Sequence, residues 1–294
     1  MYQIISLNNL GKFFLYQTLT HREIRSYLQS RELGKTIIAI GARENSSPIG
    51  LALAEINQGN KNAELLSIFV LPSHRQRGIG SALLDSLEQE LLLQDCNKIE
   101  LNCKVYKLTT PALKLLLKKF NWSELRPSVM ECMANDEMLK APWLYHKYRF
   151  PSGMKIFPWA EITSQERFVI QQSQELKPWF DEKLNPFQSL EIFEPLNSLG
   201  LRYQDRVVGW MLTERVEPDT IEYKCMFVRQ DLQKLGLGIA LFVNAIQIQD
   251  KAKIPKGRWY VKLDNLPMLR FVKKYMMPYV TSFEEISHSY KSLV

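Results

Sequence analysis

The sequence predicts a mixed α/β protein in which the same fold occurs twice along a chain of 294 residues. The first observation behind this prediction is an internal repeat. Val70 and Gly78 match Val228 and Gly236, each pair lying 158 residues apart. The second observation is local order, since in both copies an apolar run typical of a strand is followed by a glycine loop and then a helical pattern. The length allows two domains of ordinary size.

The repeat extends beyond the glycine loops. At the same offset Glu64 matches Glu222, and Arg75 matches Gln233. Upstream, Ile49–Leu51 matches Val208–Trp210 at an offset of 159 residues. The two copies therefore share their central elements and differ in the loops between them.

The first copy reads as alternating strands and helices. Apolar, β-branched runs predict strands at 2–7, 36–42, 49–56, 65–70, 98–103 and 128–133. Helical spacing predicts helices at 80–94 and 111–120, and a capping box at Thr20 and Glu23 predicts one through about Leu33.

The second copy follows the same order. Strands are expected at 155–159, 198–203, 207–214, 221–228 and 258–263, and helices at 237–248 and 267–275. A second capping box, Thr163 with Glu166, opens a helix toward Trp179. The boundary is expected within Asn135–Pro151, which gives domains 1–139 and 140–294.

Composition narrows the possible functions. The chain is 46% hydrophobic and 23% charged, which favours a packed core over disorder. It has no apolar run of about 18 residues and no secretory pattern at its start, so we expect no membrane span and a cytoplasmic location. The net charge of +7 comes from dispersed residues, which does not favour nucleic-acid binding. Oligomeric state is left open.

The cysteines predict neither a metal site nor disulfides. Cys96, Cys103, Cys132 and Cys225 show no CxxC spacing, and no histidines cluster beside them. We expect buried free thiols and no bound metal.

Each glycine loop has the features of an anion-binding site. The amide groups in the first turn of a helix have no internal partner and lie at the positive end of the helix dipole. Glycines allow the backbone to approach phosphate oxygens closely. In the first loop, Arg75 and Arg77 add charge-assisted donors.

The pattern [Arg/Gln]-x-x-Gly-x-Gly after a strand ending in valine resembles the pyrophosphate loop of the GNAT acyltransferase superfamily, and here it occurs twice. The resemblance implies two tandem GNAT folds that use acetyl-CoA or a longer acyl-CoA as co-substrate. The cofactor-binding residues it implies are Phe69, Val70, Arg75, Gln76, Arg77, Gly78, Ile79, Gly80 and Ser81 in the first copy, and Phe227, Val228, Gln233, Lys234, Leu235, Gly236, Leu237 and Gly238 in the second.

The same resemblance implies a V-shaped gap beside the strand that ends at Val70 or Val228, in which an amine attacks the thioester. The amine must first lose a proton. Glu64 and Glu222 are the candidate bases, because the repeat places them alike on the central strand. Glu55, Glu214 and Glu217 remain alternatives.

The chain departs from the family at the general acid. Many GNAT enzymes carry a tyrosine on the helix after the next strand, where this chain has Leu116 or Leu117 and Val272. Tyr106 and Tyr275 lie nearby but off register, as packing residues would.

Two functional readings follow. The first is an N-acyltransferase acting on a primary amine of a small metabolite or peptide, including a fatty acyltransferase for a lysine- or ornithine-type side chain. The second is a non-catalytic CoA-binding sensor or scaffold. Aromatic residues of the second copy are expected to pack as core, or else to line an acyl or peptide groove: Trp143, Trp159, Trp179, Phe180, Phe187, Phe193 and Trp210.

Overall fold

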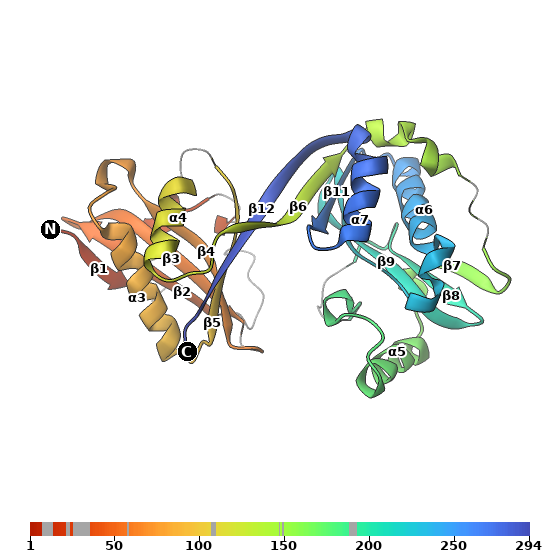
Figure 1. Ribbon diagram of the computed structural model, residues 1–294, viewed down its shortest axis with the longest axis horizontal. Helices are drawn as coiled ribbons and strands as arrows, with labels where there is room; N and C mark the ends of the chain where they lie inside the picture. The colour runs from red at the N-terminus through yellow and green to blue at the C-terminus, as the bar shows by residue number, and fades with distance from the viewer. Residues whose placement is uncertain are drawn as a thin grey trace. The chain divides into compact units, whose positions relative to one another are not determined.

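The computed structural model describes residues 1–7, 14–21, 24–25, 36–57, 59–106, 110–146, 148, 150–187 and 193–294. It divides into two compact units (Figure 1). Unit 1 comprises Met1–Ser128 and Glu285–Val294, and unit 2 comprises Val129–Glu284. These units are defined by spatial contact, and the division of the repeat at residues 139 and 140 stays a prediction.

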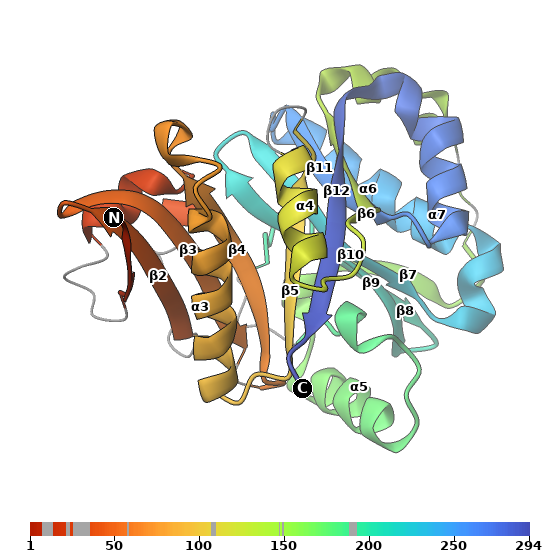
Figure 2. The same ribbon diagram turned by 60° about the vertical axis from the view of Figure 1, so that its left-hand side comes forward.

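Unit 1 is a sheet with the strand order β1-β2-β3-β4-β5-β12, covered on one face by α3 (Figure 2). Its elements are β1 (Gln3–Ser6), β2 (Thr36–Glu44), β3 (Ser47–Asn57), β4 (Asn62–Val70), α3 (Ile79–Leu93), β5 (Lys98–Lys104) and α4 (Thr110–Lys119). Leu83, Leu84, Leu87 and Leu91 of α3 are fully buried, as their helical spacing predicts. The helix predicted from Thr20 lies largely outside the described residues.

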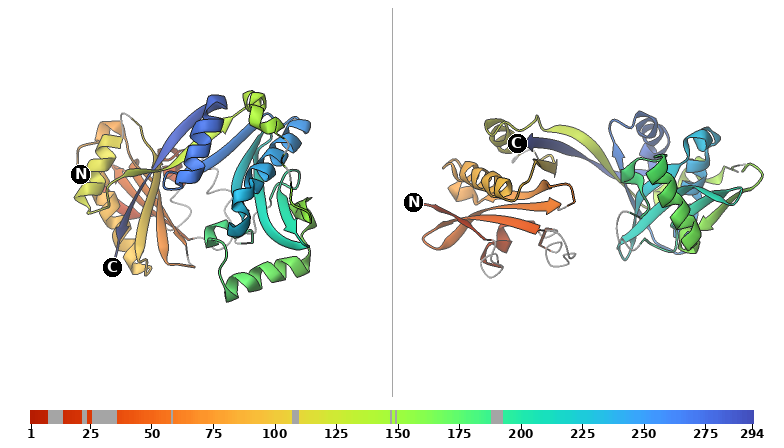
Figure 3. Two further views of the ribbon diagram at one scale, coloured as in Figure 1. Left: turned by 45° about the vertical axis from the view of Figure 1, so that its right-hand side comes forward. Right: turned by 90° about the horizontal axis from the view of Figure 1, so that it is seen from below.

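Unit 2 repeats this architecture with the order β6-β11-β10-β9-β8-β7. Helices α5 and α6 cover opposite faces of its sheet (Figure 3). Its elements are β6 (Arg126–Ala134), β7 (Met154–Pro158), α5 (Ser164–Leu176), β8 (Leu199–Tyr203), β9 (Arg206–Glu217), β10 (Thr220–Val228), α6 (Leu237–Lys251), β11 (Lys256–Lys262) and α7 (Leu266–Phe271). The predicted mixed α/β fold is confirmed.

Each sheet is completed by a strand from the other half of the sequence. The final strand, β12 (Val280–Ser292), pairs antiparallel with β5 of unit 1 over Ile286–Ser292. Strand β6 pairs with β11 of unit 2 over Val129–Ala134. The sequence pattern predicted β6 but not β12, whose residues are mostly polar and exposed.

The aromatic residues of unit 2 form a packed core beneath α5. Trp210 is fully buried, and its ring centroid lies 4.7 Å from that of Phe227 and 5.1 Å from that of Phe180. The Trp210 indole donates a hydrogen bond to the carbonyl of Leu184 at 3.0 Å. Of the two readings that the sequence left open for these rings, the packing supports core.

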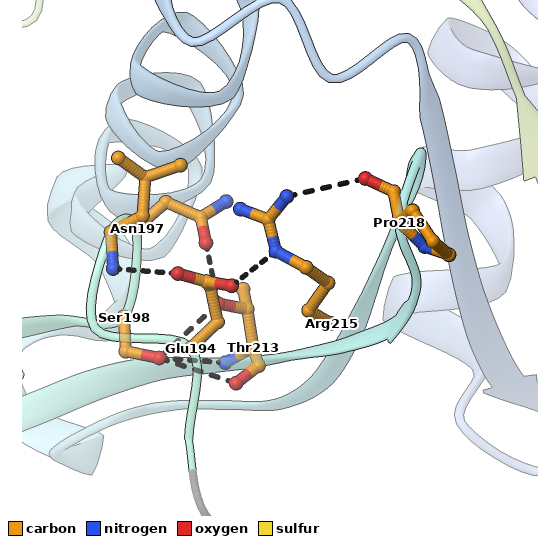
Figure 4. A network of polar contacts seen from close by, with 7 residues as sticks. Glu194, Asn197, Ser198, Thr213, Arg215 and Pro218 are labelled. Atoms are coloured by element: carbon orange, nitrogen blue, oxygen red, sulfur yellow. Dashed lines mark hydrogen bonds and ion pairs between the residues drawn. The ribbon is translucent and has the colours of Figure 1, made fainter.

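A buried polar network fastens the segment before β8 to β9 (Figure 4). Thr213 Oγ1 donates to Asn197 Oδ1 at 2.6 Å, and the Thr213 amide donates to Ser198 Oγ at 3.0 Å. Glu194 accepts from Arg215 Nε at 2.7 Å, which ties the start of this segment to the same strand. The network satisfies polar groups that would otherwise be costly to bury.

The start of α5 has the predicted capping box, with Thr163 and Glu166 each bonding the other's backbone amide. Arg202 of β8 adds an ion pair to Glu166 at 2.6 Å. The Arg202 hydrogen bond lowers the pKa of Glu166 to about 2, and the capping bonds with Thr163 act in the same direction.

We expect Glu166→Gln to lower the free energy of unfolding of unit 2 by about 2 kcal/mol at pH 7. The folded pKa lies below the ordinary value, so this stabilisation is present above pH 4.5 and is lost as the pH falls toward 2. Urea unfolding followed by tryptophan fluorescence should show a difference in the free energy of unfolding between wild type and variant that becomes smaller below pH 4.5. Glu175→Gln on the exposed face of α5 is the control, and a gap independent of pH would contradict the assignment.

Candidate active site

In unit 1 the parallel strands β4 and β5 pair only where they begin. Their register joins Asn62–Glu64 to Lys98–Glu100, although β4 continues to Val70. Strands β10 and β11 of unit 2 likewise pair only over Thr220–Tyr223 of β10. Throughout 59–106 and 193–294, which the structure describes without gaps, both pairs therefore separate as they run on. The opening predicted between these strands is present in both units.

Both central strands carry a β-bulge just beyond their glutamate. In β4 the residue without a partner on β3 is Leu66, between Leu65 and Ser67. In β10 the corresponding residue is Lys224. Leu66 and Lys224 lie 158 residues apart, so the bulge belongs to the repeat. A bulge interrupts the ladder and re-aims backbone groups, which makes an amide available where the strands separate.

In each glycine loop, the glycine that precedes the helix is left-handed. Gly78, with φ of +80°, precedes α3, and Gly236, with φ of +72°, precedes α6. Glycine is suited to this left-handed conformation, which other residues adopt only at a cost. In both units the amides in the first turn of a long helix therefore lie beside the open end of the separated strands.

The first residue of each loop motif fastens the loop to its strand. Arg75 Nε donates to the carbonyl oxygen of Val70 at 3.1 Å. Gln233 Nε2 donates to the carbonyl oxygen of Val228 at 2.8 Å. Arg75 and Gln233 can make the same bond because both side chains offer an N–H donor of similar reach.

Arg77 is engaged by a carboxylate. It forms a two-pronged ion pair with Glu44, with a shortest N–O distance of 2.6 Å, and His74 Nε2 lies 3.3 Å from the same carboxylate. The Arg77 hydrogen bond holds the pKa of Glu44 below its ordinary value. Its predicted contact with phosphate would have to compete with this pair.

Glu64 is exposed and lies at the last position of β4 that pairs with β5. It points away from α3, because its neighbours Ala63 and Leu65 belong to the core beneath that helix. The amide of Asn102 donates to Glu64 Oε1 at 3.1 Å. Within the described part of the chain, no cationic side chain pairs with Glu64. The residues beside it in register are Glu55 on β3 and Glu100 on β5.

Glu222 occupies the matching position but is buried, at 6% exposure. Arg258 Nε donates to Glu222 Oε2 at 2.8 Å, and a second guanidinium nitrogen bonds the same oxygen. Lys224 Nζ lies 3.4 Å from the other oxygen. Both oxygens of this carboxylate are therefore occupied by cationic groups rather than open to a substrate.

The difference between the two sites comes from positions that the repeat also relates. Glu100 in unit 1 corresponds to Arg258 in unit 2 at the offset of 158 residues, as Leu66 does to Lys224. Unit 2 thus has two cations where unit 1 has a carboxylate and an apolar residue. The internal repeat already aligned Glu100 with Arg258. The strand register shows why this difference matters, because it places each of the two residues next to the glutamate of its own unit.

The alternative bases lie close by. Glu55 of β3 lies opposite Glu64 in register, and Glu214 of β9 lies opposite Glu222. Lys224 Nζ lies 3.0 Å from the Glu214 carboxylate. Glu217 is exposed at the end of β9. The separation of β4 from β5 favours Glu64 among these carboxylates, because it is the last residue before the opening.

The residues found where the family has a tyrosine are apolar. Leu117 and Val272 are buried, at 2% and 0% exposure, and Leu116 packs against the core beneath α3. Tyr106 and Tyr275 are exposed, at 53% and 41%, although the Tyr275 ring lies 5.4 Å from that of Phe271.

The thiols are unsuited to nucleophilic chemistry. Burial raises the pKa of Cys103, and raises that of both Cys132 and Cys225 to about 11. All four cysteines are free. Among the residues that the structure describes, no His, Cys, Asp and Glu side chains gather as metal ligands would, and no helix is long and apolar enough to cross a membrane.

Residues 1–122 match the model of the acetyltransferase (GNAT) family. No curated protein matches the sequence. Among solved structures, a tandem GNAT protein from the clavulanic acid biosynthesis pathway is 11% identical, with 100% of this chain and 99% of that chain covered and a TM-score of 0.66.

A GCN5-related N-acetyltransferase from Sphaerobacter thermophilus is 13% identical, with 99% of this chain and 96% of that chain covered and a TM-score of 0.62. At these identities the likeness is one of fold. It covers 100% and 99% of this chain in the two comparisons.

Proposed function

We propose that unit 1 transfers an acyl group from coenzyme A to a primary amine, on the premise that residues 1–122 match the acetyltransferase (GNAT) family and that the whole chain has the fold of a tandem GNAT protein. The observation that carries the proposal is the contrast between the paired glutamates. Glu64 is exposed at the opening between two strands, whereas Glu222 is buried in an ion pair with Arg258.

The residues of unit 1 have distinct roles in this proposal. Acyl-CoA supplies a thioester whose carbon–sulfur bond breaks as the nitrogen–carbon bond forms. Glu64 accepts a proton from the ammonium group, directly or through a water molecule. Backbone amides at the Leu66 bulge donate to the carbonyl oxygen as it gains charge. The Gly78 loop and the first turn of α3 hold the pyrophosphate, and solvent returns a proton to the thiolate.

The surroundings of Glu64 favour a cationic acceptor. Glu100, its neighbour in register on β5, already pairs with Lys98, whereas Glu64 has no cationic partner among the described residues, so an ammonium group can pair with Glu64 itself. We propose the amine of a small metabolite as the acceptor and acetyl as the acyl group. The aromatic residues that could have lined a groove for a longer chain are packed as core in unit 2.

For unit 2 we propose a CoA-binding role without catalysis. Its loop has the same left-handed glycine and the same bond to the strand end as the loop of unit 1. Its glutamate, however, is compensated by two cations. The sensor or scaffold reading of the sequence is therefore assigned to this unit.

Thiol release from acyl-CoA tests the proposal. The protein is incubated with acetyl-CoA or a longer acyl-CoA and a panel of polyamines, amino acids and lysine peptides. We expect amine-dependent release that is fastest with acetyl-CoA. A native mass spectrum of the purified protein would show which CoA thioesters are retained and in what stoichiometry. Absence of release with every amine would reject the enzyme and leave a CoA-binding module.

The two loops offer a matched pair of variants. Gly78→Ala forces a side chain into a left-handed position beside the proposed pyrophosphate site, so we expect KM for acetyl-CoA to rise about tenfold. Gly236→Ala makes the same change in unit 2 and should leave KM within about twofold, because that unit is proposed not to catalyse. The opposite pattern in steady-state kinetics would move the active site to unit 2.

A further inference from the structure

Three side chains of unit 1 form a chain of hydrogen bonds that ends at Glu64. Asn102 of β5 donates from Nδ2 to Glu64 Oε1 at 3.1 Å, and its Oδ1 lies 3.1 Å from Nδ1 of His288. The register of β5 and β12 places His288 directly opposite Asn102. The candidate base is thereby connected to the strand that arrives from the far end of the sequence.

The chemistry of the three groups fixes the direction of these bonds. An ionised carboxylate only accepts hydrogen bonds, so Asn102 must present its NH₂ group to Glu64. Its oxygen then faces His288, which must donate from Nδ1. A neutral His288 therefore carries its proton on Nδ1 and leaves Nε2 as an acceptor.

The imidazole is held in place by its surroundings. Its ring stacks on Tyr290 with centroids 6.0 Å apart and an interplanar angle of 27°. The neighbouring Ser287 and Ser289 are buried at 1% and 0% exposure, and Ser289 Oγ donates to the carbonyl of Ser123 at 2.7 Å. The backbone of β12 is thus fixed on both sides of His288 along the strand.

Unit 2 has no such arrangement at the matching positions. Tyr260 stands where unit 1 has Asn102, and its hydroxyl donates to Glu131 of β6 at 3.0 Å. Glu222 is instead held by Arg258. The hydrogen-bonded connection through the Asn102 amide is therefore specific to unit 1, whose Glu64 has no cationic partner among the described residues.

We propose that His288 is a positioning residue for acyl transfer, acting through Asn102 to aim the Glu64 carboxylate at the opening between β4 and β5; this inference rests on the proposed function of Glu64. Asn102 cannot relay a proton at neutral pH, because its amide does not ionise. The effect of His288 is therefore to orient Asn102 and, through it, the base.

A double-mutant cycle tests the coupling. We expect His288→Ala and Asn102→Ala each to lower kcat about tenfold with KM for acetyl-CoA unchanged. In a Glu64→Gln background the same substitutions should change the remaining rate by less than about twofold, since the group they position is already gone. Equal losses in both backgrounds would assign His288 a merely structural role and overturn the proposal. Tyr260→Phe, the matching change in unit 2, should leave kcat unchanged.

The tautomer of His288 gives a readout that does not depend on turnover. In ¹⁵N-labelled protein at alkaline pH, long-range ¹H–¹⁵N correlation spectra should show the proton of neutral His288 on Nδ1. Asn102→Ala should release the ring to a tautomer mixture. A wild-type His288 protonated on Nε2 would overturn the inference even if acyl transfer is established. If Nδ1 carries the proton but no amine supports thiol release, the proposed function fails while the hydrogen-bond chain stands.

Discussion

Replacing Glu64 by glutamine is expected to lower the rate of acyl transfer at least 100-fold at neutral pH. A positioned general base contributes about 10² to 10⁴ in rate, and glutamine keeps the shape of the side chain without its ability to accept the proton. KM for acetyl-CoA should stay within about twofold, because the Gly78 loop is unchanged. The deficit should shrink as the pH rises toward the pKa of the amine acceptor, which then needs no base. Steady-state thiol release across pH measures both effects.

Glu222→Gln is the matched control and should behave in the opposite way. Turnover is expected to stay within about threefold of wild type. Unit 2 should lose about 2 kcal/mol of stability, because the half-buried Arg258 is left without its main counter-charge. A loss of turnover in Glu222→Gln with retention in Glu64→Gln would place catalysis in unit 2.

Trp210→Ala is expected to lower the free energy of unfolding of unit 2 by about 3–5 kcal/mol. The side chain is fully buried among aromatic rings, so truncation removes their contacts and leaves a cavity. It also leaves the Leu184 carbonyl without its indole donor. Urea unfolding followed by far-ultraviolet circular dichroism measures the change without relying on tryptophan emission.

Two further variants calibrate that loss. Phe168→Ala removes an α5 ring that is 55% exposed and should cost less than about 0.5 kcal/mol. Trp210→Phe keeps an aromatic ring and should cost less than Trp210→Ala. A loss below about 1 kcal/mol for Trp210→Ala would indicate a loosely packed cluster and restore the idea of an acyl or peptide groove.

The central elements of both units could be predicted because local chemistry specifies them. The leucines of α3 occur at helical spacing, and the capping box at Thr163 and Glu166 forms as the sequence indicates. Gly78 and Gly236 stand where the backbone turns into the left-handed region. These features depend on neighbours a few residues away, which a single sequence displays directly.

Strand β12 and the chemistry around the glutamates were not predictable in the same way. Ser287, His288 and Ser289 show no apolar strand pattern, and they form a paired strand only because β5 and Ser123 supply partners from far along the chain. Glu64 and Glu222 looked equivalent in the repeat. Their difference arises from register, which puts Glu100 beside one and Arg258 beside the other.

The completion of unit 1 by β12 has a consequence for the synthesis of the protein. When β5 has left the ribosome, about 180 residues remain to be made before Ile286–Ser292 can pair with it. At roughly 5–20 residues per second, this takes roughly 10–40 s. During that interval β5 presents an unpaired strand edge, which is open to pairing with other chains. Nascent chains halted before residue 285 should therefore be more prone to aggregation, and more dependent on chaperones, than the full chain.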